Sequence, residues 1–365
     1  MGTITRGIAN NILGNGAVDG TDALSGTIPA NNIANASLNN LTAFPPSVSA
    51  GIPQVASDPP SPTEGDVWYN TNSYNLKVKG ANIPGTSWST GGSLNTGRTW
   101  VDDGTAGAQT AAIIMGGYEQ PSVGATGKTE TYDGSSWTEI VDLNTARGEG
   151  GGAGTQTATI FFGGRVSGAP YQANTELYNG TSWTEVNDMV GGEFRMGSAG
   201  TQTAALASGG GPPYKTTTES WDGTNWTEVN DMNTARVNSA VGSQTAALVI
   251  GGELDSAPES YQTAKVESWN GSSFTEIADL NTGVRFQATS GDQSQALSFG
   301  GYPTVTNTEY WNGTSWTELN NLANGRYELG GTGSAASALA MAGNPNYTAT
   351  EEWTSPSGNL NIDLT

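Results

Sequence analysis

The absence of two residue types limits the catalytic and metal-binding chemistry that this chain can perform. The sequence contains no histidine and no cysteine. Ser-His-Asp catalysis, Cys-His catalysis and the usual zinc and copper sites all depend on those residues. A carboxylate pair could still cleave a glycosidic bond, but the glutamates recur at repeat positions and none stands out. We therefore predict a protein that is not an enzyme and that has no cofactor, no metal and no catalytic residue.

Arginine recurs at one place in the sequence, ten to twelve residues after an aromatic residue. The series is Arg98, Arg147, Arg195, Arg236, Arg285 and Arg326. We predict that these residues form a ring on one face of the fold. The ring could be a collar that binds an anion, or each arginine could pair with a carboxylate of the repeat. The carboxylates considered for such pairs are Glu139, Glu185, Glu228, Glu276 and Glu318. Six unpaired like charges close together would be costly, which favours pairing.

Tyrosine forms a second series, with one member in each connection between a second and a third predicted strand. The series is Tyr118, Tyr171, Tyr214, Tyr261, Tyr302 and Tyr347. These connections vary in length while the other turns hardly vary, and binding loops on a rigid scaffold show such variation. Tyrosine contacts sugars or proteins with little loss of entropy. The tyrosines are thus candidate binding residues, and the alternative is that they pack on the start of the third strands.

A weaker candidate is the run Asp102-Asp103-Gly104. Carboxylates close together in a turn suggest calcium, which takes six to eight oxygen ligands. The surrounding sequence lacks the further carboxylates of a calcium site, so we predict no metal here.

The elements that must position these residues are repeats. Each repeat has a Gly pair that closes an apolar run, then Glu-x-Tyr or Glu-x-Trp, then a second aromatic five residues later. The Gly pairs begin at Gly116, Gly163, Gly209, Gly251 and Gly300, with a sixth copy reduced to Ala342-Gly343. The first aromatics are Tyr132, Tyr178, Trp221, Trp269, Trp311 and Trp353. The second aromatics are Trp137, Trp183, Trp226, Phe274 and Trp316, and Trp88 precedes Arg98 in the same way.

The repeat has a period of about 41 to 49 residues, the range of propeller blades. Each unit can be divided into four strands, as residues 236–280 illustrate. Strands are expected at 237–241, 245–250, 264–269 and 273–277, and Asn270-Gly271 forms a tight hairpin before the last of them. The sequence therefore predicts an all-β fold, a β-propeller.

The order of these landmarks resembles the kelch family, over residues 85–365. The double glycine, the Tyr or Trp of the third strand and the Trp of the fourth strand carry the resemblance. It implies a six-bladed kelch-like β-propeller, and seven blades are the alternative. The last blade could be closed by the strand at Trp88 or by the alternating run 359–364. Residues 66–92 could instead belong to a seventh blade, but we favour six because closure within one blade removes exposed edges.

Composition and charge restrict the partners. The chain has 52 glycines, 13% charged residues and a net charge of −21. Such a negative surface repels phosphate, so we expect neither nucleic acid nor an anionic membrane as a partner. No run of 18 apolar residues exists, and we predict no membrane insertion.

Residues 1–63 differ from the rest and are predicted to be an extended N-terminal arm and linker, with the propeller at 64–365. Charge nearly vanishes up to residue 60, and Asn, Ala and Gly alternate with single Ile or Leu. Prolines between 44 and 63 indicate a stiff connector. So little apolar surface would hardly order the arm alone, and we expect it to dock on a partner.

The arm is similar to the N-termini of structural proteins from tailed phages of marine bacteria, as are residues 64–71 and the Asn-Gly-Thr-Ser-Trp repeats. The resemblance implies a virion protein, a tail fibre or a head or tail appendage, assembled in the bacterial cytoplasm. Expected partners are other virion proteins through residues 1–63 and a host-surface glycan or protein, with a homotrimer as the oligomer. The alternatives are an intracellular kelch-type adaptor and a glycan-active enzyme of the phage.

Overall fold

The computed structural model describes residues 53–57, 67–72, 75–78, 87–121, 124–166, 170–255, 261–354 and 360–362. Every regular element among them is a β-strand, which confirms the predicted all-β class. The chain divides into two compact units, residues 1–83 with 357–365, and residues 84–356. Residues 64–83 are thus grouped with the N-terminal unit and not with the unit that holds the repeats. Most of the predicted arm lies outside the described residues.

The repeat unit, residues 84–356, contains six four-stranded sheets among its described residues, each with its strands in antiparallel order. The first strands are β6 (Thr105–Ala108), β12 (Gly151–Thr155), β16 (Gly197–Thr201), β20 (Val237–Ser243), β24 (Ala288–Gly291) and β28 (Gly330–Ser334). The second strands are β7 (Ala111–Met115), β13 (Ala158–Phe162), β17 (Ala204–Ser208), β21 (Ala246–Glu253), β25 (Ala296–Phe299) and β29 (Ser337–Met341). We number the sheets first to sixth in this order.

The outer half of each sheet is a hairpin. The third strands are β10 (Thr129–Tyr132), β14 (Thr175–Tyr178), β18 (Thr218–Trp221), β22 (Val266–Trp269), β26 (Thr308–Trp311) and β30 (Thr350–Thr354). The fourth strands are β11 (Trp137–Glu139), β15 (Trp183–Val186), β19 (Trp226–Val229), β23 (Phe274–Glu276), β27 (Trp316–Glu318) and β4 (Trp88–Thr90). A small further sheet joins β5 (Arg98–Thr99), β8 (Tyr118–Glu119) and β9 (Gly124–Ala125).

The hairpin turn explains why the repeat keeps Asn-Gly or Asp-Gly. In the second sheet the Asn179 Oδ1 accepts hydrogen bonds from the backbone N–H groups of Thr181 and Ser182, each at 2.9 Å. Gly180 has a φ of +89°, a conformation that glycine adopts without a Cβ penalty. The turn places Tyr178 opposite Trp183 on the two strands.

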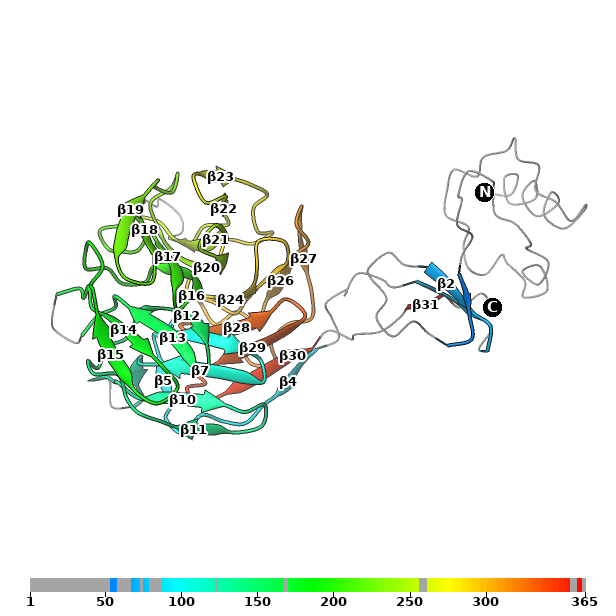
Figure 1. Cartoon of the computed structure of the whole chain (residues 1–365), viewed down its shortest axis with the longest axis horizontal. Helices are drawn as coiled ribbons and strands as arrows, with labels where there is room; N and C mark the ends of the chain where they lie inside the picture. Colours follow the sequence, from blue (N-terminus) through cyan, green and yellow to red (C-terminus); the bar gives the residue numbers. More distant parts are fainter. Residues whose placement is uncertain are drawn as a thin grey trace, which may run out of the picture. The chain divides into compact units, whose positions relative to one another are not determined.

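The first strands contact one another in sequence order, from β6 through β12, β16, β20 and β24 to β28, and β28 contacts β6. In Figure 1 the labelled first strands, β12, β16, β20, β24 and β28, lie in the middle of this unit, and the labels of the fourth strands lie toward its outside. This arrangement of sheets is propeller-like.

Side chains from the repeats join neighbouring sheets. Trp226 of the third sheet donates its Nε1–H to the Thr175 Oγ1 of the second sheet at 2.9 Å, and its ring lies 4.7 Å from Phe162. In the turn before β17, Gln202 donates to the carbonyl oxygens of Thr159 and Tyr178, at 3.1 and 2.5 Å. The core thus lies between the sheets, where the repeated aromatic side chains are buried.

The sixth sheet is assembled from both ends of the repeat unit. β4 is its outer strand, with Trp88 opposite Trp353 of β30. Gln109 of the first sheet donates to the carbonyl oxygens of Ala338 and Trp353 of the sixth, at 2.9 and 2.6 Å. Of the two strands considered for this place, the strand at Trp88 therefore fills it.

The C-terminal run forms a strand in the other unit. β31 (Leu360–Ile362) pairs with β3 (Asn75–Val78), which pairs with β2 (Val67–Asn70). β1 (Gln54–Val55) joins this sheet in parallel with β2, and Trp68 is buried. The suggestion that residues 359–364 provide the fourth strand of the last repeat is thus wrong.

Candidate functional site

One backbone position before each sheet is equivalent in all six repeats. Its carbonyl oxygen accepts a hydrogen bond from the second residue of the Gly pair in the preceding sheet, at 2.7–3.1 Å. We call it the arginine position. From the first to the sixth sheet it is occupied by Arg98, Arg147, Glu193, Arg236, Val284 and Arg326.

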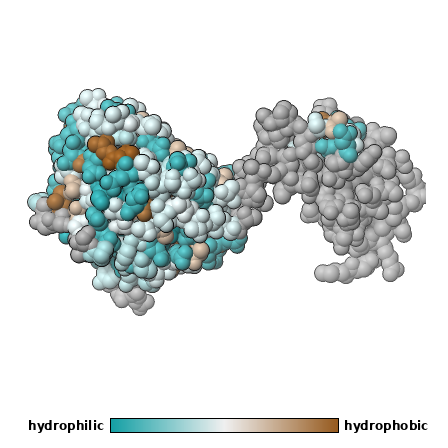
Figure 2. Space-filling model, turned by 90° about the horizontal axis from the view of Figure 1, so that it is seen from below, coloured by the Kyte–Doolittle hydropathy of each residue, from teal (hydrophilic) through white to brown (hydrophobic). Residues whose placement is uncertain are grey.

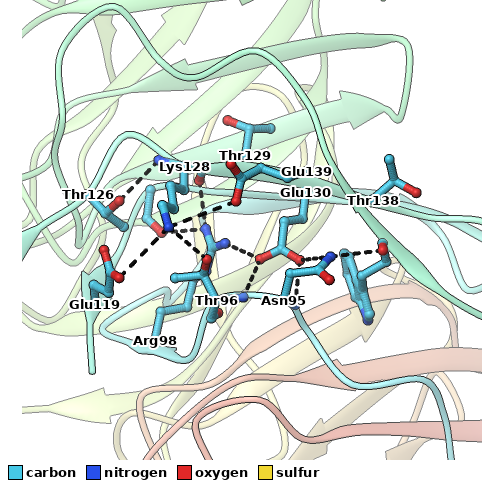
Figure 3. A network of polar contacts seen from close by, with 12 residues as sticks. Asn95, Thr96, Arg98, Glu119, Thr126, Lys128, Thr129, Glu130, Thr138 and Glu139 are labelled. Carbon is cyan, nitrogen blue, oxygen red and sulfur yellow. Dashed lines mark hydrogen bonds and ion pairs between the residues drawn. The ribbon is translucent and has the colours of Figure 1, made fainter. Parts of the chain in front are cut away.

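Arg98 shows what this position does when it holds arginine (Figure 3). The guanidinium is fully buried and pairs with Glu130 of β10. It also donates to the carbonyl oxygens of Thr96, Gly116 and Lys128, at 3.3, 3.1 and 2.6 Å. Burial lowers the pKa of Arg98, and the ion pair with Glu130 opposes this effect. One carboxylate and three carbonyl groups thus replace the water that the guanidinium has lost.

The same pairing occurs in three further sheets. The pairs are Arg147 with Glu176, Arg236 with Glu267, and Arg326 with Glu351. These four arginines are fully buried, so they are not an exposed anion-binding collar. Their partners are the glutamates of the third strands and not the predicted ones of the fourth strands, such as Glu139. The third-strand glutamate is buried while its cross-strand neighbour on the fourth strand is exposed.

Arg195 and Arg285 do not belong to this series. Each arginine of the series follows its aromatic by ten residues, but Arg195 follows Trp183 by twelve and Arg285 follows Phe274 by eleven. Both side chains are partly exposed, and they form ion pairs with Glu149 and Glu253 respectively. The spacing therefore distinguishes the two groups.

The six tyrosines lie in the connections in which they were predicted, with different exposures. Tyr171, Tyr261 and Tyr302 are 37%, 54% and 39% exposed. The other three, Tyr118, Tyr214 and Tyr347, are partly buried. The Tyr171 hydroxyl donates to the Pro212 carbonyl oxygen at 2.8 Å, in the next connection.

Arginine and aromatic side chains form a continuous series of contacts that includes Tyr171 and Tyr302, and the ring centre of the third exposed tyrosine, Tyr261, lies 5.7 Å from the Arg285 guanidinium. We call this series the aromatic–arginine band, and its members are Tyr171, Phe194, Arg195, Trp100, Phe286, Arg285 and Tyr302. The Arg195 guanidinium lies 3.9 Å from the ring centre of Trp100, and the Arg285 guanidinium lies 4.4 Å from that of Tyr302. The other neighbours in the series are 4.3–5.3 Å apart. Such contacts attract a cation to the face of a ring and hold both groups in place.

Three members of this band have an uncommon backbone conformation. Trp100, Arg195 and Phe286 have φ of +52°, +54° and +56°, and Glu149 and Glu328 at equivalent positions have +60° and +58°. All five follow the arginine position by two residues. A non-glycine residue in this region costs on the order of 1–3 kcal/mol, and such residues cluster at functional sites. Because Glu149 and Glu328 are buried, this conformation is a feature of the repeat at this position, which the band members Trp100, Arg195 and Phe286 share.

Carboxyl groups with raised pKa values accompany the band. Burial raises the pKa of Asp102 to about 7, and Arg195 partly offsets the rise. Burial also raises the pKa of Glu328 to about 9, and the nearby Asp102 adds to it. Near neutral pH, Glu328 is therefore protonated and able to donate a hydrogen bond, while Asp102 titrates.

Asp103 has a different role. Its Oδ2 accepts hydrogen bonds from the backbone N–H groups of Ser198 and Ala240, at 2.8 and 3.1 Å. It thereby ties the first sheet to the first strands of the third and fourth. Burial raises its pKa to about 8 against the lowering effect of these two bonds.

Two further acidic residues lie near Asp102. Glu149 and Glu328 influence its charge, although they are far away in the sequence. Yet no group of three Asp or Glu side chains in the described part of the chain is arranged to hold a metal ion.

The face drawn in Figure 2 is mainly hydrophilic, with small apolar areas. Among the described residues there is also no helix that could cross a membrane.

The sequence prediction missed Trp100, Phe194, Phe286, Glu149 and Glu328. A regularity was available, because the residue twelve positions after each fourth-strand aromatic is Trp100, Glu149, Arg195, Asn238, Phe286 or Glu328. At this position Glu149, Asn238 and Glu328 are buried, whereas Trp100, Arg195 and Phe286 are partly exposed. Comparison with models of known protein families finds no match, and neither does a search of curated proteins.

Proposed function

We propose that the chain is a non-enzymatic binding protein, built as a six-bladed kelch-like β-propeller. Six sheets in the described residues, contact between β28 and β6, and the place of β4 in the sixth sheet support this architecture. Closure by β4 joins the two ends of the repeat unit within one sheet, which leaves no open edge between them.

The observation that carries the binding function is the aromatic–arginine band. Tryptophan, tyrosine and arginine dominate the binding energy of protein interfaces, and the aromatic rings of tryptophan and tyrosine also stack on sugars. Trp100 and Tyr302 are held by neighbouring guanidinium groups, so little conformational freedom remains to be lost on binding. Asp102 and Glu328 belong to the same electrostatic network, with Glu328 and the Asp102 Oδ2 buried.

We further propose that this binding serves a phage virion, as a tail fibre or a head or tail appendage. The similarity of residues 1–63 to phage structural proteins supports this part, and those residues would attach the chain to another virion protein. An antibody against the chain should label purified particles of the phage that encodes it. Labelling of infected cells without labelling of the particles would contradict the virion role.

The recognition role can be tested with fluorescent full-length protein on host cells and on their isolated surface polysaccharide. We expect saturable binding that Trp100→Ala and Tyr302→Ala each weaken by about 2 kcal/mol, roughly thirtyfold in Kd. Val141→Ser is the control, because Val141 is 45% exposed and lies outside the band. Saturable binding that all three variants retain would show that the band is not the recognition surface, and no binding would refute host recognition.

A further inference from the structure

The third sheet departs from the arginine–glutamate pairing in a specific way. Its arginine position holds Glu193, ten residues after Trp183, and the Glu193 carbonyl oxygen accepts from the Gly164 N–H at 2.7 Å. The backbone is therefore in register with the other sheets, and only the side chain differs. A carboxylate stands where four other sheets have a guanidinium.

The buried glutamate of this sheet has lost donors that its counterparts keep. Glu130 of the first sheet accepts from the Asn95 N–H and Nδ2, from the Thr96 N–H and from Arg98. Glu219 of the third sheet, 7% exposed, accepts from the backbone N–H groups of Val190 and Gly191, at 2.8 and 3.3 Å. Val190 replaces the asparagine, and Glu219 has no ion pair among the described residues.

The cations and anions around Glu219 do not balance. Lys215 pairs with Glu193 at 2.5 Å, and Glu228 lies directly opposite Glu219 on the neighbouring strand. Three carboxylates thus face one ammonium group. Burial raises the pKa of Glu219, which is the expected response of a carboxylate that lacks a cation.

A cavity of about 150 Å³ lies at this place. Its lining includes Gly191, Gly209, Thr217 and Glu219. By position in the repeat these residues correspond to Thr96, Gly116, Lys128 and Glu130, the four partners of the Arg98 guanidinium. One water needs only roughly 10–15 Å³, so a guanidinium has room. Val190, 61% exposed, and the exposed Glu228 lie at the opening.

The fifth sheet shows that the absence of arginine alone does not leave such a space. Val284 occupies its arginine position, and Glu309 keeps the donors of Asn281 and Thr282. The corresponding cavity is about 60 Å³ and is lined by Val284, Val305 and Tyr302 among others. The fifth-sheet cavity is therefore smaller, and both apolar and polar side chains line it.

We propose that the third-sheet cavity binds a guanidinium group from outside the chain, an arginine side chain of a partner protein. The guanidinium would pair with Glu219 and donate to the carbonyl groups of Gly209 and Thr217, as Arg98 does at the corresponding groups. The cavity lining includes no member of the aromatic–arginine band, although the lining residue Glu193 accepts a hydrogen bond from the Phe194 N–H at 3.1 Å. This site gives the propeller a second contact, with a partner that presents an arginine on its surface.

The test uses the full-length chain and N-acetyl-arginine amide, with binding measured by calorimetry. The citrulline analogue has nearly the same shape as arginine but no charge. Its affinity should be lower by at least about tenfold, as expected for the loss of a hydrogen bond to a charged group. Glu219→Gln should weaken arginine binding to a similar degree. Glu309→Gln in the fifth sheet is the matched control and should leave binding unchanged.

A second variant keeps the test independent of folding defects. Glu193→Arg should fill the third-sheet cavity from within, so that the protein becomes more stable and no longer binds the arginine probe. Binding of free guanidinium at the same affinity as the arginine amide would indicate a small-ion site and not a protein contact. The proposal is overturned if the probe does not bind, or if Glu193→Arg lowers the melting temperature and leaves binding intact.

Discussion

Four sheets have arginine at the arginine position and two do not. The two groups of sheets differ in how they accommodate a buried glutamate. A third-strand glutamate is buried in all six sheets. In four of them a buried guanidinium neutralises it, and in the third and fifth sheets other groups stand at the same backbone position. Where valine takes the place, a small space lined by apolar and polar side chains remains, and where glutamate takes it, a larger cavity remains. The repeat therefore tolerates loss of the arginine–glutamate pair. The residue that replaces arginine determines the size of the cavity beside the buried glutamate.

The largest effect should come from removing the carboxylate where an arginine depends on it. Glu130→Gln leaves Arg98 buried without its counter-charge and should destabilise the protein by about 3–5 kcal/mol. The same substitution at Glu309 removes no ion pair within the described residues and should cost about 1 kcal/mol. Denaturant unfolding of both variants measures the difference. Equal losses would show that the ion pair is not what distinguishes the two sheets.

Removing both partners should cost less than removing one. Arg236→Met combined with Glu267→Leu leaves no buried charge, and such replacements are often nearly neutral in proteins. We expect Glu267→Leu alone to lose about 3–5 kcal/mol and the double variant to recover most of it. A double variant as unstable as the single one would mean that hydrogen bonds to the carbonyl groups, and not charge balance, dominate.

The carboxyl groups without a full counter-charge should make stability depend on pH. The folded pKa values of Asp102, Asp103 and Glu328 are raised to about 7, 8 and 9, so the folded state binds more protons than the unfolded state above pH 4. Their stabilising contribution is complete below the unfolded pKa and is lost as the pH rises through 7 to 9. The melting temperature should therefore fall from about pH 4 to about pH 9 and change little above that. Asp103→Asn and Glu328→Gln should each flatten this dependence, and an unchanged slope in both would contradict the assignment.

The smallest effect concerns one lost hydrogen bond in the third sheet. Val190→Asn should restore the amide donor that Asn95 provides to Glu130, and it should stabilise the protein by about 0.5–1.5 kcal/mol. Val190→Ala is the control, because it removes the same exposed side chain without adding a donor. The comparison fails if both variants change the melting temperature equally.

The sequence predicted the strands, the hairpin turns and the all-β class because each depends on local patterns. Alternation, Asn-Gly turns and buried aromatics recur at fixed spacings, and packing between sheets agrees with them. The partner of each arginine was not predictable in the same way. Glu130 and Glu139 lie opposite each other on the two strands of one hairpin, and they differ in that Glu130 is buried and Glu139 is exposed. The C-terminal strand was also misplaced, since alternation does not specify which sheet edge a strand joins.

The candidate site was predicted only in part, for a similar reason. The tyrosines were identified from loop position, but Trp100 and Phe286 lie in segments that looked like ordinary repeat sequence. The exact ten-residue spacing of four arginines distinguishes them from Arg195 and Arg285, and it also assigns Glu193 and Val284 to the arginine position. Whether such a replacement leaves a cavity depends on how the neighbouring side chains fill the space. The spacing of residues in the sequence does not carry this information.

A crystal structure of the protein soaked with N-acetyl-arginine amide would show directly whether the third-sheet cavity binds a guanidinium group. We expect a guanidinium bound against Glu219, between Gly209 and Thr217, and no ligand beside Glu309 in the fifth sheet. A third-sheet cavity that holds only water, or a side chain of Lys215 turned in to pair with Glu219, would contradict this expectation.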